Sequence, residues 1–249
     1  MANFPTEMVN LPSKGKLYPK TSPLSKGEVE LKYMTAKEED ILTSINLIRK
    51  GIVLDKLLEA LIVDKSIKLS DMLVGDKNSI LIAARILGYG KEYTLQVMCE
   101  ECDERSPIKV DCTKFDDIEI DDKVTQNKFS IDLPTTKVKL EFKLLTSGEE
   151  SDVMKEVEGL QKIQPDINFL NSYRYKKMIL SVNGETQKSA INDFVDNQFL
   201  TRDTVVFKKY LNEITPDVDM TYECKCPKCG HSQEVDVPLG TGFFWPDTE

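Results

Sequence analysis

Two short cysteine pairs constrain this chain more than any other feature of its sequence. Cys99-Glu-Glu-Cys102 and Cys226-Pro-Lys-Cys229 have the Cys-x-x-Cys spacing that lets two sulfurs reach one metal ion. Four thiolates in a tetrahedron suit Zn²⁺, which has no geometric preference of its own. One ion bound by both pairs would close the long stretch between them into a loop. We therefore predict a structural zinc bound by Cys99, Cys102, Cys226 and Cys229.

The segments beside each pair strengthen this prediction. Alternating apolar residues precede the pairs at 93–98 and 218–222, and shorter alternating segments follow at 108–110 and 235–237. This pattern predicts strand, turn and strand, twice over. The sequence therefore indicates a zinc ribbon split between residues 91–112 and 218–249.

The other two cysteines and the single histidine leave the ligand set open. Cys224 lies two residues before Cys226, on the same face of an extended strand, and could replace it as a ligand. Cys112 ends the return strand of the first half, and His231 could in principle bind the metal. The turn spacing favours the two pairs. Disulfides are disfavoured, because no secretory signal is recognisable and disulfides seldom persist in the cytosol.

Charge argues against the most familiar use of a zinc ribbon, which is nucleic-acid binding. The chain has 33 basic and 42 acidic residues, a net charge of −9, and no long basic run. Neutralisation of phosphates drives nucleic-acid binding, and the first pair is surrounded by acidic residues. We expect no nucleic-acid partner, and a zinc-ribbon nucleic-acid-binding regulator remains the alternative function.

Enzymatic and membrane roles are also disfavoured. A catalytic zinc keeps an open coordination position and has a base nearby, whereas this chain offers four thiols and one histidine. We therefore predict no catalytic residues. No segment reaches the roughly 18 consecutive apolar residues of a membrane helix, so we expect a protein of the cytoplasm with no membrane contact.

Periodicity predicts an α+β fold with a mostly helical body, the split zinc ribbon and a small β-hairpin at 129–133 and 138–142. Residues 1–34 are expected to form an extended arm and a strand, and 35–90 a helical region. In that region a helix is predicted over 79–87 after a turn-rich hinge at 69–78, with Arg85 in solvent or paired with a carboxylate. Residues 113–217 are expected to form an inserted hairpin and helical region.

Three adjacent aromatic residues, Phe243, Phe244 and Trp245, lie near the end of the sequence, between glycines and a proline. Aromatic side chains often dominate the energetics of protein interfaces, so this trio is a candidate partner-binding site. The same residues could instead fold back and cover the ribbon. The sequence leaves both arrangements open.

Several short motifs in a fixed order resemble a known family. They are Leu11-Pro-Ser-Lys-Gly15 with Tyr18-Pro19, Leu73-Val-Gly-Asp76 leading to Ala84-Arg85 and Tyr89-Gly90, the paired cysteine turns, and Phe243-Phe-Trp-Pro246. In this order they are similar to the baseplate hub assembly proteins of T-even-type contractile-tailed bacteriophages. The resemblance implies a late viral protein that binds baseplate hub proteins in the host cytoplasm, either as a transient assembly factor or as a minor component of the virion baseplate. It brings no catalytic residues and says nothing of the oligomeric state. Cys224 departs from the simpler cysteine pattern expected for that family.

Overall fold

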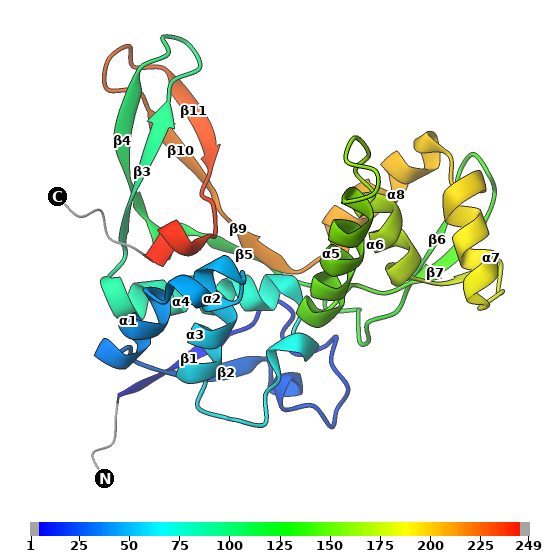
Figure 1. Cartoon of the computed structure of the whole chain (residues 1–249), viewed down its shortest axis with the longest axis horizontal. Coiled ribbons are helices and arrows are strands. Elements are labelled where there is room, and N and C mark those ends of the chain that lie inside the picture. The colour runs from blue at the N-terminus through cyan, green and yellow to red at the C-terminus, as the bar shows by residue number, and fades with distance from the viewer. Residues whose placement is uncertain (1–4, 245–249) are drawn as a thin grey trace.

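The computed structural model of this chain describes residues 5–244. Within them it has a mixed α+β fold with eight α-helices and five small antiparallel sheets (Figure 1). The expected α+β class is confirmed. Strands occur in every part of the chain, however, so a mostly helical body with one ribbon and one hairpin understates the β content.

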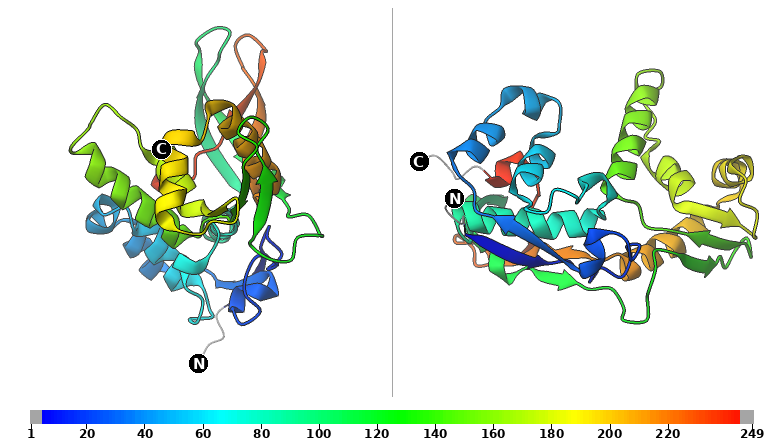
Figure 2. Two further views of the ribbon diagram at one scale, coloured as in Figure 1. Left: turned by 90° about the vertical axis from the view of Figure 1, so that its right-hand side faces the viewer. Right: turned by 90° about the horizontal axis from the view of Figure 1, so that it is seen from below.

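The N-terminal body consists of a two-stranded sheet and four helices. The elements are β1 (Thr6–Asn10), β2 (Glu28–Lys32), α1 (Ala36–Leu42), α2 (Ile45–Arg49), α3 (Val53–Leu61) and α4 (Val74–Tyr89). Short 3₁₀ turns lie at Pro23–Lys26 and Leu69–Asp71. The longest helix, α4, runs through the middle of this body and contacts both β1 and the strand β9 described below (Figure 2).

Two hairpins rise side by side from the body (Figure 1). One is β3 (Glu92–Met98) with β4 (Arg105–Asp111), and the other is β10 (Thr221–Lys225) with β11 (Ser232–Asp236). Below them, β5 (Asp116–Ile118) pairs with β9 (Asp217–Asp219). The chain leaves the body through β5 and returns through β9.

The segment between β5 and β9 forms the second half of the molecule. It has one three-stranded sheet and four helices: β6 (Phe129–Asp132), β7 (Lys139–Phe142), β8 (Ile179–Val182), α5 (Ser147–Gln161), α6 (Leu170–Met178), α7 (Lys188–Asp193) and α8 (Thr201–Ile214). A π-helical turn, Phe194–Gln198, follows α7. The predicted hairpin is present as β6 and β7, and β8 extends it to three strands.

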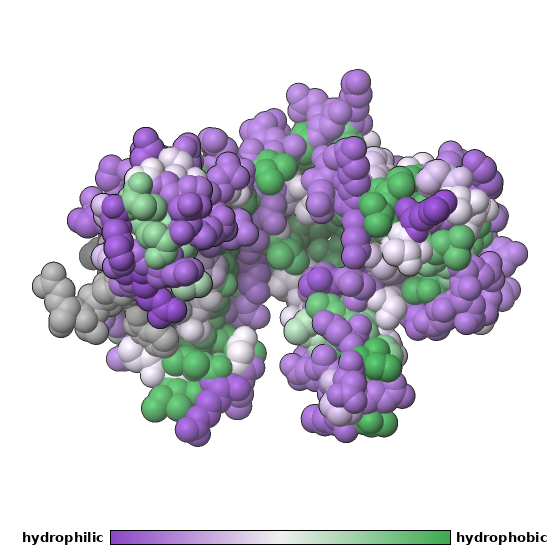
Figure 3. Space-filling model, turned by 90° about the horizontal axis from the view of Figure 1, so that it is seen from above, coloured by the Kyte–Doolittle hydropathy of each residue, from purple (hydrophilic) through white to green (hydrophobic). Residues whose placement is uncertain are grey.

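Each half of the molecule has its own hydrophobic core, although Leu17 and Leu73 of the N-terminal half pack in the second one. The first contains side chains from 11–112 together with Val218, Val237, Phe243 and Phe244. The second centres on aromatic side chains of the inserted segment, where Phe142 meets Phe207 edge to face with ring centroids 4.8 Å apart. Between the two halves lies a cleft of about 930 Å³, and Figure 3 shows apolar side chains in this hollow.

The start of α4 holds the N-terminal arm through a fully buried carboxylate. Asp76 accepts hydrogen bonds from Ser13 N at 2.9 Å, Ser13 Oγ at 2.6 Å and the Tyr18 hydroxyl at 2.5 Å. Tyr18 in turn accepts a hydrogen bond from Leu73 N at 2.8 Å. Burial raises the pKa of Asp76 although these donors oppose the rise. A buried carboxylate needs such partners, so the arm is fixed to the helix.

The other end of α4 carries a buried arginine. The Arg85 guanidinium donates from Nε to Phe243 O at 2.8 Å, from Nη1 to Gly90 O at 2.9 Å and from Nη2 to Glu92 O at 2.9 Å. It also lies over the Tyr89 and Phe243 rings. Arg85 is therefore neither solvated nor paired with a carboxylate, and it joins α4 to the base of the ribbon and to the 3₁₀ turn at Thr241–Phe244.

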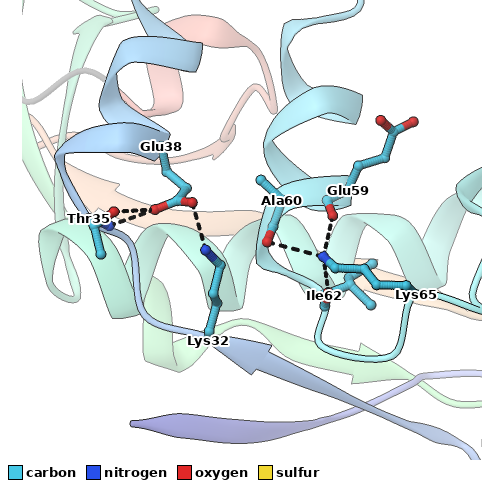
Figure 4. Close-up of polar contacts among 7 residues, drawn as sticks. All are labelled: Lys32, Thr35, Glu38, Glu59, Ala60, Ile62 and Lys65. Carbon is cyan, nitrogen blue, oxygen red and sulfur yellow. Dashed lines mark hydrogen bonds and ion pairs between the residues drawn. The ribbon is translucent and has the colours of Figure 1, made fainter. Parts of the chain in front are cut away.

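Two polar contacts fix the ends of the short N-terminal helices (Figure 4). The buried Glu38 carboxylate accepts hydrogen bonds from Lys32 Nζ at 2.7 Å, Thr35 N at 2.9 Å and Thr35 Oγ1 at 2.6 Å. At the end of α3, Lys65 Nζ donates to the carbonyls of Glu59, Ala60 and Ile62. The last carbonyls of a helix have no partner within the helix, so Lys65 caps α3.

The crossing between α4 and the returning chain requires a glycine at position 75. A Cβ added to Gly75 would lie 2.0 Å from Pro216 O and 2.7 Å from the Asp217 Cα. We expect Gly75→Ala to lower the free energy of unfolding by about 3 kcal/mol, the upper end for an overpacked site. Gly159→Ala is the matched control, because its Cβ would meet nothing within 4 Å; it should gain about 0.5–1 kcal/mol in helix propensity. Urea unfolding measures both, and equal stability of the two variants would contradict the close crossing.

The Glu38 contacts make part of the stability dependent on pH. Burial alone would raise the pKa of Glu38, but hydrogen bonds from Lys32 and Thr35 outweigh it and hold the pKa at about 2, against 4.5 for a free side chain. A lowered carboxyl pKa contributes stability above pH 4.5 that is lost as the pH falls toward 2. We expect Glu38→Gln to cost about 2 kcal/mol at pH 7 and progressively less below pH 4.5. The exposed neighbour variant Glu39→Gln should show neither effect in the same unfolding series; a pH-independent difference between wild type and Glu38→Gln would argue against this assignment.

Candidate metal centre

The tips of the two hairpins bring four sulfur atoms together. The Sγ atoms of Cys99, Cys102, Cys226 and Cys229 all lie within 4.8 Å of one another. The Cys99 and Cys229 sulfurs are 3.6 Å apart, and the Cys102 and Cys226 sulfurs are 3.7 Å apart. A regular tetrahedron with zinc–sulfur bonds of about 2.3 Å has edges of about 3.8 Å. The four sulfurs therefore fit one tetrahedral ion.

The two turns that carry these cysteines have the same backbone hydrogen bonds. In the first, Cys99 N donates to Glu104 O and Asp103 N donates to Cys99 O; in the second, Cys226 N donates to His231 O and Gly230 N donates to Cys226 O. In each turn the fourth residue after the first cysteine is left-handed, with φ 55° at Asp103 and 76° at Gly230. Asparagine, aspartate and glycine tolerate this region best. Both turns thus form one type of metal-binding knuckle.

Backbone amides near one sulfur favour its thiolate form. The Cys229 N–H has the largest effect on the Cys226 thiol. With the Lys228 N–H and the thiols of Cys229 and Cys102 it outweighs burial and lowers the pKa of Cys226 to about 6. Because a metal binds the thiolate, these donors prepare the sulfur for ligation.

Contacts between the hairpins involve residues that sequence reasoning did not single out. The Gln233 amide accepts from Glu100 N at 3.1 Å and donates to Met98 O at 3.1 Å, so one side chain of β11 bridges to the first turn. Lys228 pairs with Glu104 at 2.6 Å across the tip. Only tertiary pairing of the hairpins makes these partners, so no local signal in the sequence identifies them.

The remaining candidate ligands lie outside the sulfur cluster. Cys224 is buried and pairs with Gln233 in the ladder between β10 and β11. Cys112 is buried in the first hydrophobic core. His231 contributes its backbone carbonyl to the second knuckle. Among residues 5–244, the cluster that can hold a metal comprises the two Cys-x-x-Cys pairs.

The aromatic residues near the end of the described chain need a correction. Phe243 and Phe244 were candidates for binding a partner, but their exposed fractions are 1% and 0%. Phe243 packs edge to face on Tyr93 with ring centroids 5.1 Å apart, and both rings belong to the first core. They fold back at the base of the ribbon because that position removes two large apolar side chains from water. Trp245 lies outside the described residues, and its expected role at a partner surface stays a prediction.

Acidic residues outnumber basic ones at the ribbon tip, where Glu100, Glu101, Asp103 and Glu104 lie near Arg105, Lys225 and Lys228. Glu100, Glu101 and Asp103 surround the first turn, while the amine of Lys228 is occupied by Glu104. This arrangement gives the tip little attraction for phosphate, which weakens the case for a nucleic-acid-binding regulator. No helix within residues 5–244 has the length and apolar character needed to cross a bilayer.

Comparison with known protein families identifies the family to which the chain is similar. A family model described as T4 bacteriophage base plate protein matches residues 1–245. Searches of curated proteins and of solved structures found no significant match. The family agrees with the resemblance of the sequence motifs, and it indicates a baseplate-related structural or assembly role among other phage baseplate proteins. Because the match spans almost the entire sequence, the chain belongs to the T4 bacteriophage base plate protein family.

Proposed function

We propose that this chain is a non-enzymatic assembly factor for the central hub of a phage tail baseplate, where it binds hub proteins and carries one structural zinc ion. The family match over residues 1–245 is the observation that carries the proposal. The proposal that the protein acts at the hub rests on the resemblance of its sequence motifs to those of hub assembly proteins. The protein would act in the host cytoplasm while the baseplate is built.

The zinc part of the proposal rests on the four sulfurs at the ribbon tip. Their mutual distances suit one tetrahedral ion, and four thiolates fill its coordination sphere. A closed sphere leaves no position for substrate or water, so the ion would have a structural role. Cys99, Cys102, Cys226 and Cys229 would hold it.

The ribbon has a physical need for such an ion. Each half is a two-stranded hairpin, and an isolated two-stranded hairpin is at best marginally stable in water. One metal bound by both tips would fasten two marginal elements to each other. The rest of the chain has two hydrophobic cores of its own and does not depend on the ion in the same way.

The metal content tests this part of the proposal. Purified protein is expected to contain about one zinc per chain, and Cys102→Ser or Cys229→Ser should lose it, because three ligands hold the ion less tightly. Amide exchange should then accelerate in 92–111 and 221–236 and stay slow in α4 and α8. Cys112→Ala and Cys224→Ala are the matched controls and should retain zinc. Full zinc content in Cys229→Ser would refute the ligand set.

The assembly role is tested in infected cells. Phage lacking the wild-type protein should be rescued by it, whereas Cys102→Ser should give far fewer complete baseplates, since a disordered ribbon cannot present a fixed surface. Cys112→Ala is the control and should rescue. Affinity capture of the tagged chain should recover hub proteins, and analysis of purified particles shows whether the chain stays in the virion. Normal hub assembly without the chain would overturn the proposal.

A further inference from the structure

A groove beside α4 in the N-terminal body lies between the open edges of β1 and β5. It has a volume of about 400 Å³ and is lined by β1, by α4 and by residues of β5 and β9. Figure 2 (right) shows β1 and β5 on the same side of α4. The floor is one helical stripe of α4 with the spacing i, i+3, i+4, i+7 and i+8, formed by Ser79, Ile82, Ala83, Ile86 and Leu87.

One wall of the groove is a strand edge with unused hydrogen-bonding groups. At the two ends of the ladder Tyr33 N donates to Pro5 O and Leu11 N donates to Gly27 O, so the odd-numbered residues of β1 face β2. Antiparallel pairing then turns the backbone groups of Thr6, Met8 and Asn10 away from β2. Within residues 5–244, β1 pairs with β2 alone, and no other hydrogen bond engages these outward groups. An edge of this kind is a template for another strand.

The shape of the groove limits what can enter it. At one end β1 and β5 converge, where Ile120 N donates to Pro12 O at 3.3 Å and Lys14 pairs with Glu119 at 2.5 Å. The groove is therefore bounded on both sides and closed at one end. A single extended segment fits such a space, whereas a second copy of this chain would have to bring its own β2 and α4 with its edge strand.

The charge beside the groove indicates the chemistry of the occupant. Glu7 of β1 and Asp117 of β5 line the groove, and neither has an ion-pair partner among residues 5–244. Burial raises the pKa of Asp117, and the nearby carboxylates of Glu119, Asp76 and Asp116 raise it further. A cationic segment would relieve this repulsion.

We infer that the groove between β1 and β5 binds an extended segment of a partner protein, which adds to the outer edge of β1. The segment places apolar side chains on the α4 stripe and carries lysine or arginine toward Glu7 and Asp117. Main-chain hydrogen bonds to the edge give affinity in this mode, and pockets for alternate side chains give specificity. The inference deepens the proposed assembly role by naming where a client is held, and it rests on that role.

A peptide test separates this inference from the proposed function. The probe is a fluorescent Lys-Val-Lys-Val-Lys-Val-Lys peptide, titrated with the zinc-loaded full chain, with Glu-Val-Glu-Val-Glu-Val-Glu as the charge-reversed control. The cationic peptide is expected to bind and to protect the Thr6, Met8 and Asn10 amides from exchange. Absence of binding, or protection elsewhere only, overturns the groove assignment while leaving the assembly role intact.

Variants distinguish edge pairing from general attraction to an acidic protein. Met8→Pro removes an outward N–H that β2 does not use and should weaken binding about tenfold, whereas Met8→Leu keeps that donor and should bind normally. Ala83→Leu fills the floor and should weaken binding without lowering thermal stability. Equal affinity of all four proteins refutes the inference. If the wild-type protein self-associates and Met8→Pro abolishes this, the groove binds a second copy of the chain and the inference is refuted. If deletion of residues 1–4 tightens peptide binding, the groove belongs to the chain's own N-terminus, which also refutes the inference.

Discussion

The fold depends on two charged side chains that α4 carries into the interior. Asp76 lies in the first turn of the helix, where a carboxylate suits the helix dipole, and Arg85 lies just before the last turn. A buried charge is tolerated only when its hydrogen bonds are satisfied, so each of these side chains requires several hydrogen-bond partners, some of them from distant parts of the chain. Asp76 accepts hydrogen bonds from Ser13 and Tyr18 and so fixes the N-terminal arm. Arg85 donates hydrogen bonds to the carbonyls of Gly90, Glu92 and Phe243 and so fixes the base of the ribbon. One helix thereby orients the N-terminal arm, the segment that follows its own C-terminus and the distant turn at Thr241–Phe244.

The ribbon is fastened at both ends by different means. At its base, Arg85 and the buried Phe243 and Phe244 hold it to the first hydrophobic core. At its tip, four sulfurs, Gln233 and the Lys228–Glu104 pair join the two hairpins. The exposed ion pair contributes little, because solvent screens it and ordering two long side chains costs entropy. A metal at the tip would therefore supply most of the stability there, and the base would remain attached without it.

The same architecture suits a protein that holds others during assembly. The inserted half is joined to the body through the β5–β9 pair and the close crossing at Gly75, which leaves an apolar cleft between the halves and an open strand edge beneath α4. Both the cleft and the groove are concave surfaces, and the two hydrophobic cores stabilise the protein around them. Interfaces of modest size that are formed by edges and grooves release more readily than large hydrophobic ones, a property that the proposed assembly role would use.

The sequence by itself determined the turns and strands that depend only on neighbouring residues. The Cys-x-x-Cys turns, the strands around them and the hairpin at 129–142 follow from spacing and alternation, because a turn or a strand is decided by neighbouring residues. The tertiary structure decided the rest. Residues 74–78, expected as part of a hinge, are the first turns of α4 because Asp76 is held there by Ser13 and Tyr18. Arg85, expected in solvent or on a carboxylate, donates to the nearby carbonyls of Gly90 and Glu92 and to that of Phe243, which only the folded chain brings to it. Phe243 and Phe244 fill the core instead of facing a partner. Spacing selects which cysteines can share an ion, but only the pairing of two distant hairpins places their sulfurs within bonding range of one.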